Sequence, residues 1–308
     1  MSQTFEPDIL IIGGAHIDRI GRSTARLEPG QSNPGTLKRN VGGVAGNIAQ
    51  CLARLDWNVT LSSICGRDAD ADLIQSELTK AGIDLAFLVT EGSKPSASYT
   101  AIEDRDGSLI AGIADMSIYD SYPPEKLADC LSGLSEPTII VADTNLPVSV
   151  LDALADKKGN HFLAVSAVSG PKANRAAEIL EKVDLLFCNE AEAAILAQEF
   201  AELDALPEIL MEIGVKAGII TKGGAGLSAW QDKEFFSRPA PPVKVRSTNG
   251  AGDALAASML HALLLQTPFD KALDYGMAGA SLALMSEQTV PDMLNRSMLE
   301  ACIADIPT

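Results

Sequence analysis

The chain has 308 residues and a net charge of −17 at neutral pH, and 46% of its residues are hydrophobic. The acidic charge argues against nucleic-acid binding, which needs cationic contacts to phosphate, and no apolar run approaches the roughly 20 residues that cross a bilayer. Five widely spaced cysteines, and a start without a basic segment before an apolar one, predict a reduced cytoplasmic protein with no signal peptide.

Short apolar runs alternate with longer segments in which apolar residues recur every three or four positions. This alternation is typical of parallel strands covered by helices. The expected strands are 9–12, 59–63, 138–142, 162–165, 185–188 and 218–221. The expected helices between them are 44–55, 71–81, 124–134, 148–155, 173–183 and 206–213, followed by 251–265, 268–286 and 295–304. Because no internal repeat or low-complexity linker interrupts the pattern, we predict one α/β domain over residues 1–308.

Two segments break the alternation. Residues 31–41 are polar and contain the turn signal Asn-Pro-Gly, and residues 96–115 alternate around the turn signal Asp-Arg-Asp-Gly, which indicates a hairpin. Since the two segments flank Gly42 and Gly43, we expect them to form a small β lid over a cleft. A plain surface hairpin is the alternative.

Gly42 and Gly43 stand directly before the amphipathic helix 44–55. Glycines allow a ligand to approach the backbone closely, and Asn47 offers both a donor and an acceptor to hydroxyl groups. Asp18 follows the first strand, at the edge where open α/β sheets bind ligands, and its carboxylate can accept two hydrogen bonds from vicinal hydroxyls. These residues favour a sugar or ribose site, although a structural glycine turn and a solvated aspartate would also explain them.

Residues 247–253 read Ser-Thr-Asn-Gly-Ala-Gly-Asp and run directly into an apolar helix. The amides of Gly250, Ala251 and Gly252, together with the positive end of the helix dipole, would form a site for an anion. Asp253 could cap the helix or take a proton from a substrate hydroxyl. An anion site beside a carboxylate is what phosphoryl transfer to an alcohol requires, and a glycine turn with a capping aspartate is the alternative.

Residues 42–49 and 247–253 resemble, in this order, the two signatures of the PfkB (ribokinase-like) carbohydrate and nucleoside kinases. The resemblance covers essentially the whole chain and implies a ribokinase-like three-layer α/β/α sandwich with a mostly parallel central sheet and a small β lid. It also implies ATP-dependent phosphorylation of a nucleoside 5′-hydroxyl. Segments most similar to family members that act on pseudouridine are 11–18, 32–35, 96–99, 115–118 and 141–145. Ribose, or another sugar or nucleoside, is the alternative acceptor.

Carried over residue by residue, the resemblance implies four sets of site residues. The catalytic set is the base Asp253 with the amides of Gly250, Ala251 and Gly252. The acceptor set is Asp18, His16, Gly42, Gly43, Asn47, Ser98, Asp143 and Asn145. The nucleotide set is Lys172, Asn189, Thr221, Gly223, Gly226 and Asn249. Glu192, one helical turn from Asn189, is expected to organise Mg²⁺, partly through water. A glycine-rich hairpin is the local alternative for residues 221–226.

Three positions depart from the family pattern. His16 stands where Asn is usual, Ser166 replaces an Asp, and Ser247 replaces an Asp tied to monovalent-cation binding. The last departure leaves activation by K⁺ open. Lid strands commonly pair between subunits in the family, so we expect a homodimer.

Two other classes of protein are alternatives to a kinase. A non-catalytic sugar-binding regulatory protein on the same fold is possible in principle, because fold does not fix function, but the catalytic motif is intact. A dinucleotide-binding oxidoreductase is disfavoured because no GxGxxG follows the first strand. The chain also lacks the GxxxxGK[ST] pattern of P-loop enzymes.

Overall fold

The computed structural model describes residues 8–134, 138–198, 202–304 and 306, so both ends of the predicted domain, 1–7 and 307–308, lie outside the described residues. The main sheet has eight strands in the order β14-β13-β12-β11-β10-β9-β1-β4. Six of them run parallel: β1 (Ile9–Ile12), β4 (Val59–Ser62), β9 (Ile139–Asp143), β10 (Phe162–Ser166), β11 (Leu185–Asn189) and β12 (Ala217–Thr221). These are the six predicted strands. The antiparallel β13 (Leu227–Gln231) and β14 (Glu234–Arg238) extend one edge, so residues 221–226 do turn into a hairpin.

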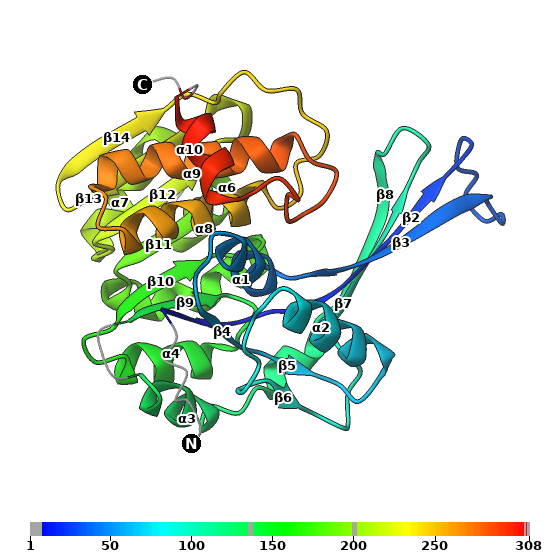
Figure 1. Ribbon diagram of the computed structural model, residues 1–308, viewed down its shortest axis with the longest axis horizontal. Coiled ribbons are helices and arrows are strands. Elements are labelled where there is room, and N and C mark those ends of the chain that lie inside the picture. The colour runs from blue at the N-terminus through cyan, green and yellow to red at the C-terminus, as the bar shows by residue number, and fades with distance from the viewer. Residues whose placement is uncertain (1–7, 135–137, 199–201, 305, 307–308) are drawn as a thin grey trace.

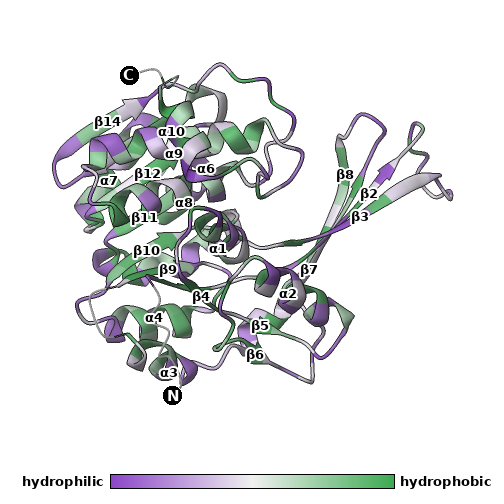
Figure 2. Cartoon of the chain, viewed as in Figure 1, coloured by the Kyte–Doolittle hydropathy of each residue, from purple (hydrophilic) through white to green (hydrophobic). Residues whose placement is uncertain are grey.

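Helices cover both faces of this sheet (Figure 1). In β1, Ile9 and Ile11 enter one hydrophobic core while Leu10 and Ile12 enter the other, because successive strand side chains point to opposite faces. One face carries α1 (Val44–Arg54), α2 (Ala69–Lys80), α8 (Ala251–Leu264), α9 (Phe269–Leu284) and α10 (Arg296–Ile303). The other carries α3 (Lys126–Ser132), α4 (Val148–Lys157), α6 (Glu190–Ala197) and α7 (Leu206–Ile213). Apolar colouring accordingly concentrates in the central strands (Figure 2). The three-layer prediction is confirmed.

The segment predicted as an α-helix over 173–183 has a different conformation. It consists of the short α5 (Gly170–Ala173) and the 3₁₀ helix η2 (Asn174–Lys182). Its buried positions, Ala173, Ala176, Ile179, Leu180 and Val183, recur every three or four residues, so the apolar pattern alone does not distinguish a 3₁₀ helix from an α-helix. The remaining short elements are β5 (Ile64–Cys65), β6 (Val89–Thr90), η1 (Ser117–Ser121), η3 (Leu203–Ala205) and η4 (Gly223–Ala225). No helix in the described part of the chain is long and apolar enough to cross a membrane.

A second sheet of four strands projects from the body and forms the lid (Figure 1). Its order is β3 (Gly35–Gly42), β2 (His16–Ser23), β7 (Ser98–Glu103) and β8 (Leu109–Asp115). The predicted segments 31–41 and 96–115 supply three of the strands. Sequence analysis missed β2, whose residues were read as the loop after β1. Ile17 and Ile20 are three positions apart, so this segment lacks the alternation of apolar and polar residues that marks a strand. The alternation is weak because most positions of β2 are only half-buried.

Candidate active site

Most of the predicted site residues lie along the carboxyl edge of the main sheet. Asp143 of β9 pairs with Ser166 of β10, and Asn189 of β11 pairs with Thr221 of β12. The order of strand addition reverses at β1: β4 lies on one side of it and β9 on the other, and all three strands run parallel. Ligands of open α/β sheets bind at such a reversal. The fold therefore gathers the acceptor candidates around β1 and β9, and several nucleotide candidates around β11 and β12.

Asp253, the predicted base, lies in the first turn of α8. Asn47 of α1 donates a hydrogen bond of 2.7 Å from Nδ2 to Asp253 Oδ2. Burial raises the pKa of Asp253 to about 7; the hydrogen bond from Asn47 opposes this, and the negative charges of Asp143, Asp18 and Glu192 add to it. A carboxylate that titrates near neutrality can both take and release a proton under physiological conditions.

The glycine turn before Asp253 has the geometry of an anion site. Gly250 is the N-cap of α8 with φ of 77°, and a Cβ atom there would lie 2.0 Å from the carbonyl oxygen of Thr289. Only glycine fits this position. Gly252 faces open space, and the amides of Gly252 and Asp253 find no acceptor among the described residues. The amide of Ala251, which was expected to join Gly250 and Gly252 in the anion site, instead donates to the carbonyl oxygen of Thr248 at 3.4 Å. Two N–H groups at the positive end of a 14-residue helix are thus available to an anion.

Asp18 and His16 lie at the base of the lid, in β2. His16 Nε2 is 3.1 Å from Asp18 Oδ1, and a Cβ atom on Gly42 would lie 2.1 Å from Asp18 Oδ2. A Cβ atom on Gly43, whose φ is 95°, would lie 2.3 Å from the carbonyl oxygen of Gly14. The close neighbours of the glycine pair are therefore protein groups: the Asp18 carboxylate for Gly42 and the Gly14 backbone for Gly43. Packing within the protein is enough to require glycine at both positions.

Asp143 is 1% exposed, and protein amides occupy both of its carboxylate oxygens. Oδ2 accepts from the amides of Gly14 at 2.9 Å and Ala45 at 3.0 Å, and Oδ1 accepts from the amide of Asn145 at 2.8 Å. These bonds join the loop after β1 to the start of α1. The geometry therefore corrects the expectation of a direct acceptor contact: Asp143 fixes the loops that carry other acceptor residues.

Asn145 and Lys172 contact each other, although they were assigned to different sets. Lys172 Nζ donates to Asn145 Oδ1 at 2.6 Å, which brings Lys172 to the acceptor side. Burial lowers the pKa of Lys172, and the charge of Asp143 partly restores it. Sequence analysis missed Tyr119, whose hydroxyl oxygen is 3.5 Å from His16 Nδ1. Its only sequence signal was its place beside the segment 115–118.

Ser98 does not join this cluster. Strand pairing sets Ser98 opposite Ile17 and Tyr99 opposite Asp18. Directly paired residues share a face of a sheet, so Ser98 lies on the face away from Asp18 and Tyr99 lies on the Asp18 face. A slip of one position in reading a strand changes the face, and the pairing register was not visible in the sequence.

The nucleotide candidates divide into structural and accessible residues. Asn189 and Glu192 form a capping box: Asn189 Oδ1 accepts from the amide of Glu192, and Glu192 Oε2 accepts from the amide of Asn189, each at 2.9 Å. A Cβ atom on Gly226 would lie 2.0 Å from the carbonyl oxygen of Arg238, so packing against β14 explains that glycine. Gly223 and Asn249 are exposed, and Thr221 is half-buried.

Glu192, the residue expected to organise Mg²⁺, lies in the first turn of α6. It is 7% exposed; burial raises its pKa, and hydrogen bonds from the amides of Asn189 and Ser169 oppose that rise. Within the described ranges, no group of three His, Cys, Asp or Glu side chains gathers as a preformed metal site. A carboxylate already engaged by two amides fits a contact to Mg²⁺ through water, not a dedicated cage of protein ligands.

A carboxyl group with a pKa near 7, two available amides at a helix start and polar side chains at the base of a lid are the arrangement expected of a phosphotransferase with an alcohol group as acceptor. The model of the pfkB family of carbohydrate kinases matches residues 6–295, and the chain belongs to that family.

Similar proteins extend over nearly the whole chain. A pseudouridine kinase of Escherichia coli K12 is 28% identical over 91% of each chain. A carbohydrate kinase of Agrobacterium tumefaciens has a structure with a TM-score of 0.86 and 32% identity, covering 97% of this chain and 98% of that one. The ribokinase of Thermotoga maritima, at 21% identity, has a TM-score of 0.85 and covers 96% and 99%. The ribokinase-like fold is confirmed.

Proposed function

We propose that this protein transfers the γ-phosphoryl group of ATP to the 5′-hydroxyl of pseudouridine. Sequence likeness to the E. coli pseudouridine kinase favours this acceptor. The structural observation that carries the proposal is a pair of buried side-chain atoms, Asn47 Oδ1 and Asn145 Nδ2, both in the predicted acceptor set, for which the described part of the chain supplies no hydrogen-bond partner.

The orientation of each amide follows from its neighbour. An ammonium can only donate, so Lys172 requires the oxygen of Asn145 and leaves Nδ2, which lies beside Gly14, as a donor. The Asp253 carboxylate takes Nδ2 of Asn47 and leaves Oδ1 as an acceptor. A ribose hydroxyl suits the Asn47 acceptor and a uracil carbonyl suits the Asn145 donor. Leaving such groups unpaired costs about 1–3 kcal/mol each, which a matching ligand recovers.

Catalysis in this proposal is positioning with charge stabilisation. Asp18 and Asn47 hold the ribose so that its 5′-oxygen faces Asp253. As the oxygen–phosphorus bond forms, the bond from the γ-phosphorus to the β,γ-bridging oxygen breaks and ADP leaves. The hydroxyl proton passes to Asp253, and the amides of Gly252 and Asp253 stabilise the charge on the transferring group.

ATP is proposed to lie toward β11 and β12, over Thr221, Gly223 and Asn249. Mg²⁺, held by phosphate oxygens and water with Glu192 behind the water, would neutralise phosphate charge. Ser247 has no carboxylate with which to bind K⁺. Its hydroxyl oxygen accepts a hydrogen bond from the amide of Asn249 at 3.2 Å. We therefore expect activity without added K⁺.

The test compares pseudouridine, uridine, adenosine, cytidine and ribose as acceptors with MgATP. Pseudouridine keeps both ring N–H groups, whereas uridine has one fewer, so kcat/KM should favour pseudouridine by roughly 5- to 150-fold. Asn145→Asp keeps the partner of Lys172 but removes the donor to the base carbonyl, and should lower kcat/KM for pseudouridine and uridine alike while leaving that for ribose unchanged. Ser258→Ala removes another buried unpartnered hydroxyl, between α8 and α9, and serves as the control. A ratio near one, or preference for ribose, would defeat the acceptor assignment and leave the kinase activity standing.

We further propose a cytoplasmic homodimer formed through the lid. Leu37, Ile102 and Ile113 share one lid face, where they are 86%, 38% and 70% exposed. The apolar colouring of β8, away from the body, is visible in Figure 2. Light scattering should find a dimer that Leu37→Asp with Ile113→Asp converts to a monomer, while Leu265→Asp, an exposed leucine on the body, leaves it intact. A wild-type monomer at micromolar concentration would refute the dimer.

A further inference from the structure

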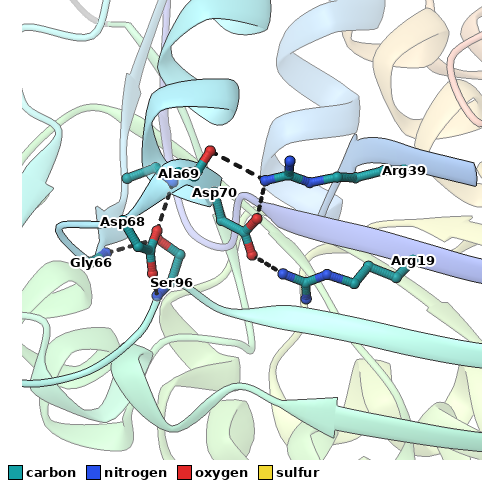
Figure 3. Close-up of polar contacts among 8 residues, drawn as sticks. Arg19, Arg39, Gly66, Asp68, Ala69, Asp70 and Ser96 are labelled. Atoms are coloured by element: carbon teal, nitrogen blue, oxygen red, sulfur yellow. Dashed lines mark hydrogen bonds and ion pairs between the residues drawn. The ribbon is translucent and has the colours of Figure 1, made fainter.

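Two arginines of the lid converge on a single carboxylate of the body (Figure 3). Arg19 of β2 and Arg39 of β3 are directly paired across the lid sheet. Arg19 Nη2 donates to one oxygen of Asp70 and Arg39 Nη2 donates to the other. Arg39 Nη2 also donates to the carbonyl oxygen of Ala69 at 3.2 Å. Asp70 belongs to the first turn of α2, and its side chain is 12% exposed.

A third lid strand is tied to the same helix start. Asp68, the N-cap of α2, accepts from the amide of Ser96 at 2.8 Å and from its hydroxyl at 2.7 Å. The Ser96 hydroxyl in turn accepts from the amide of Gly66 at 2.9 Å. Since Ser96 lies two residues before β7, the first turn of α2 holds three of the four lid strands (Figure 3). We call Asp68 and Asp70, with Arg19, Arg39 and Ser96, the lid anchor.

The lid anchor and the acceptor site occupy opposite faces of the same two strands. Arg19 directly follows Asp18, and Asn40, paired with Asp18, directly follows Arg39. Neighbouring residues of a strand point to opposite faces, so arginines turned toward α2 leave Asp18 on the other face of the lid, with His16. The tilt of the lid over the body and the position of Asp18 are therefore set by the same contacts.

We propose that Asp70 is a positioning residue that sets acceptor affinity by fixing the lid strands to α2. Because Asp70 offers one oxygen to each arginine, losing one oxygen leaves one lid arginine without its partner. The affinity consequence rests on the proposed function, whereas the attachment of the lid does not.

The test compares Asp70→Asn with Asp70→Glu and with the control Asp72→Asn, an exposed acidic residue in the same first turn. Asp70→Asn should speed amide hydrogen exchange in β2 and β3 and raise the KM for pseudouridine about 10-fold, as expected for one lost charge-assisted hydrogen bond. The kcat should change less than about threefold, and the Kd for ATP, measured by calorimetry, should stay the same. Asp70→Glu keeps both oxygens and should restore affinity, and Asp72→Asn should behave as wild type.

Three results would overturn the proposal. Exchange in β2 and β3 that does not change would show that the anchor does not hold the lid. Exchange that rises equally in β9 and β10 would show a general loss of stability. A KM that rises equally for pseudouridine and ATP, or that Asp70→Glu fails to restore, would remove the positioning role. If no acceptor in the panel is phosphorylated, the exchange measurement still decides whether the anchor exists, so its failure is separable from failure of the proposed function.

Discussion

Replacing Asp253 with Asn should abolish most activity while making the protein more stable. The side chain keeps its shape, and its oxygen can still accept from Asn47, but it can no longer take the hydroxyl proton. A positioned base contributes roughly 10²- to 10⁴-fold, so kcat should fall by at least about 100-fold with ATP affinity retained.

The stability change follows from the raised pKa. The Asp253 pKa is about 7 in the folded protein against an ordinary value of 3.8 for an aspartate, so the unfolded state binds fewer protons between these two pH values. The free energy of unfolding therefore falls as the pH rises from 3.8 toward 7, because folding must either bind a proton at Asp253 or bury its charge. The neutral amide of asparagine avoids this loss. Asp253→Asn should accordingly raise the Tm at pH 8 more than at pH 5.

The wild-type pH profile provides an independent measurement. With a pKa of about 7, the ionised fraction of Asp253 is about 9% at pH 6 and about 91% at pH 8. The kcat/KM at pH 8 should therefore exceed that at pH 6 by about tenfold. Asp270→Asn, in the first turn of the neighbouring helix α9, is the matched control and should keep the profile. A flat profile from pH 5.5 to 8.5, or an Asp253→Asn variant within a few-fold of wild type, would refute the assignment of the base.

Three more expectations concern single residues. Asp18→Ala should weaken nucleoside binding in a calorimetric titration and leave ATP binding unchanged; the reverse would place the acceptor on the wrong side of the cleft. Gly250→Ala should lower both kcat and Tm, because its φ of 77° and the nearby Thr289 carbonyl oxygen exclude a Cβ atom; wild-type values would contradict this. His261 is 1% exposed, and burial, followed by the charge of Arg296, lowers its pKa to about 4. Urea melts should lose up to about 3 kcal/mol from this group between pH 6.5 and pH 4, where the unfolded state binds the extra proton, and His261→Gln should reduce that loss.

The sequence alone determined the parts of the fold that depend on local pattern. The six parallel strands are short apolar runs, and the helices that cover them repeat apolar residues every three or four positions. Each of these elements could therefore be predicted from the residues of its own segment. The glycine turn before α8 was visible for the same reason: Gly250 to Asp253 is a contiguous stretch whose backbone and helix start need no distant partner to be recognised.

Tertiary structure decided what the polar residues do, because their partners are distant in the chain. Asp143 contacts amides that lie 129 and 98 residues away, and this turns a predicted ligand contact into a support for two loops. Strand register moved Ser98 to the far face and brought Tyr99 beside Asp18. The two arginines of β2 and β3 read as solvated charges until the fold set them against Asp70, 51 and 31 residues further along. Local periodicity can be read from neighbouring residues, whereas strand register and ion pairs between distant segments form only when the chain folds.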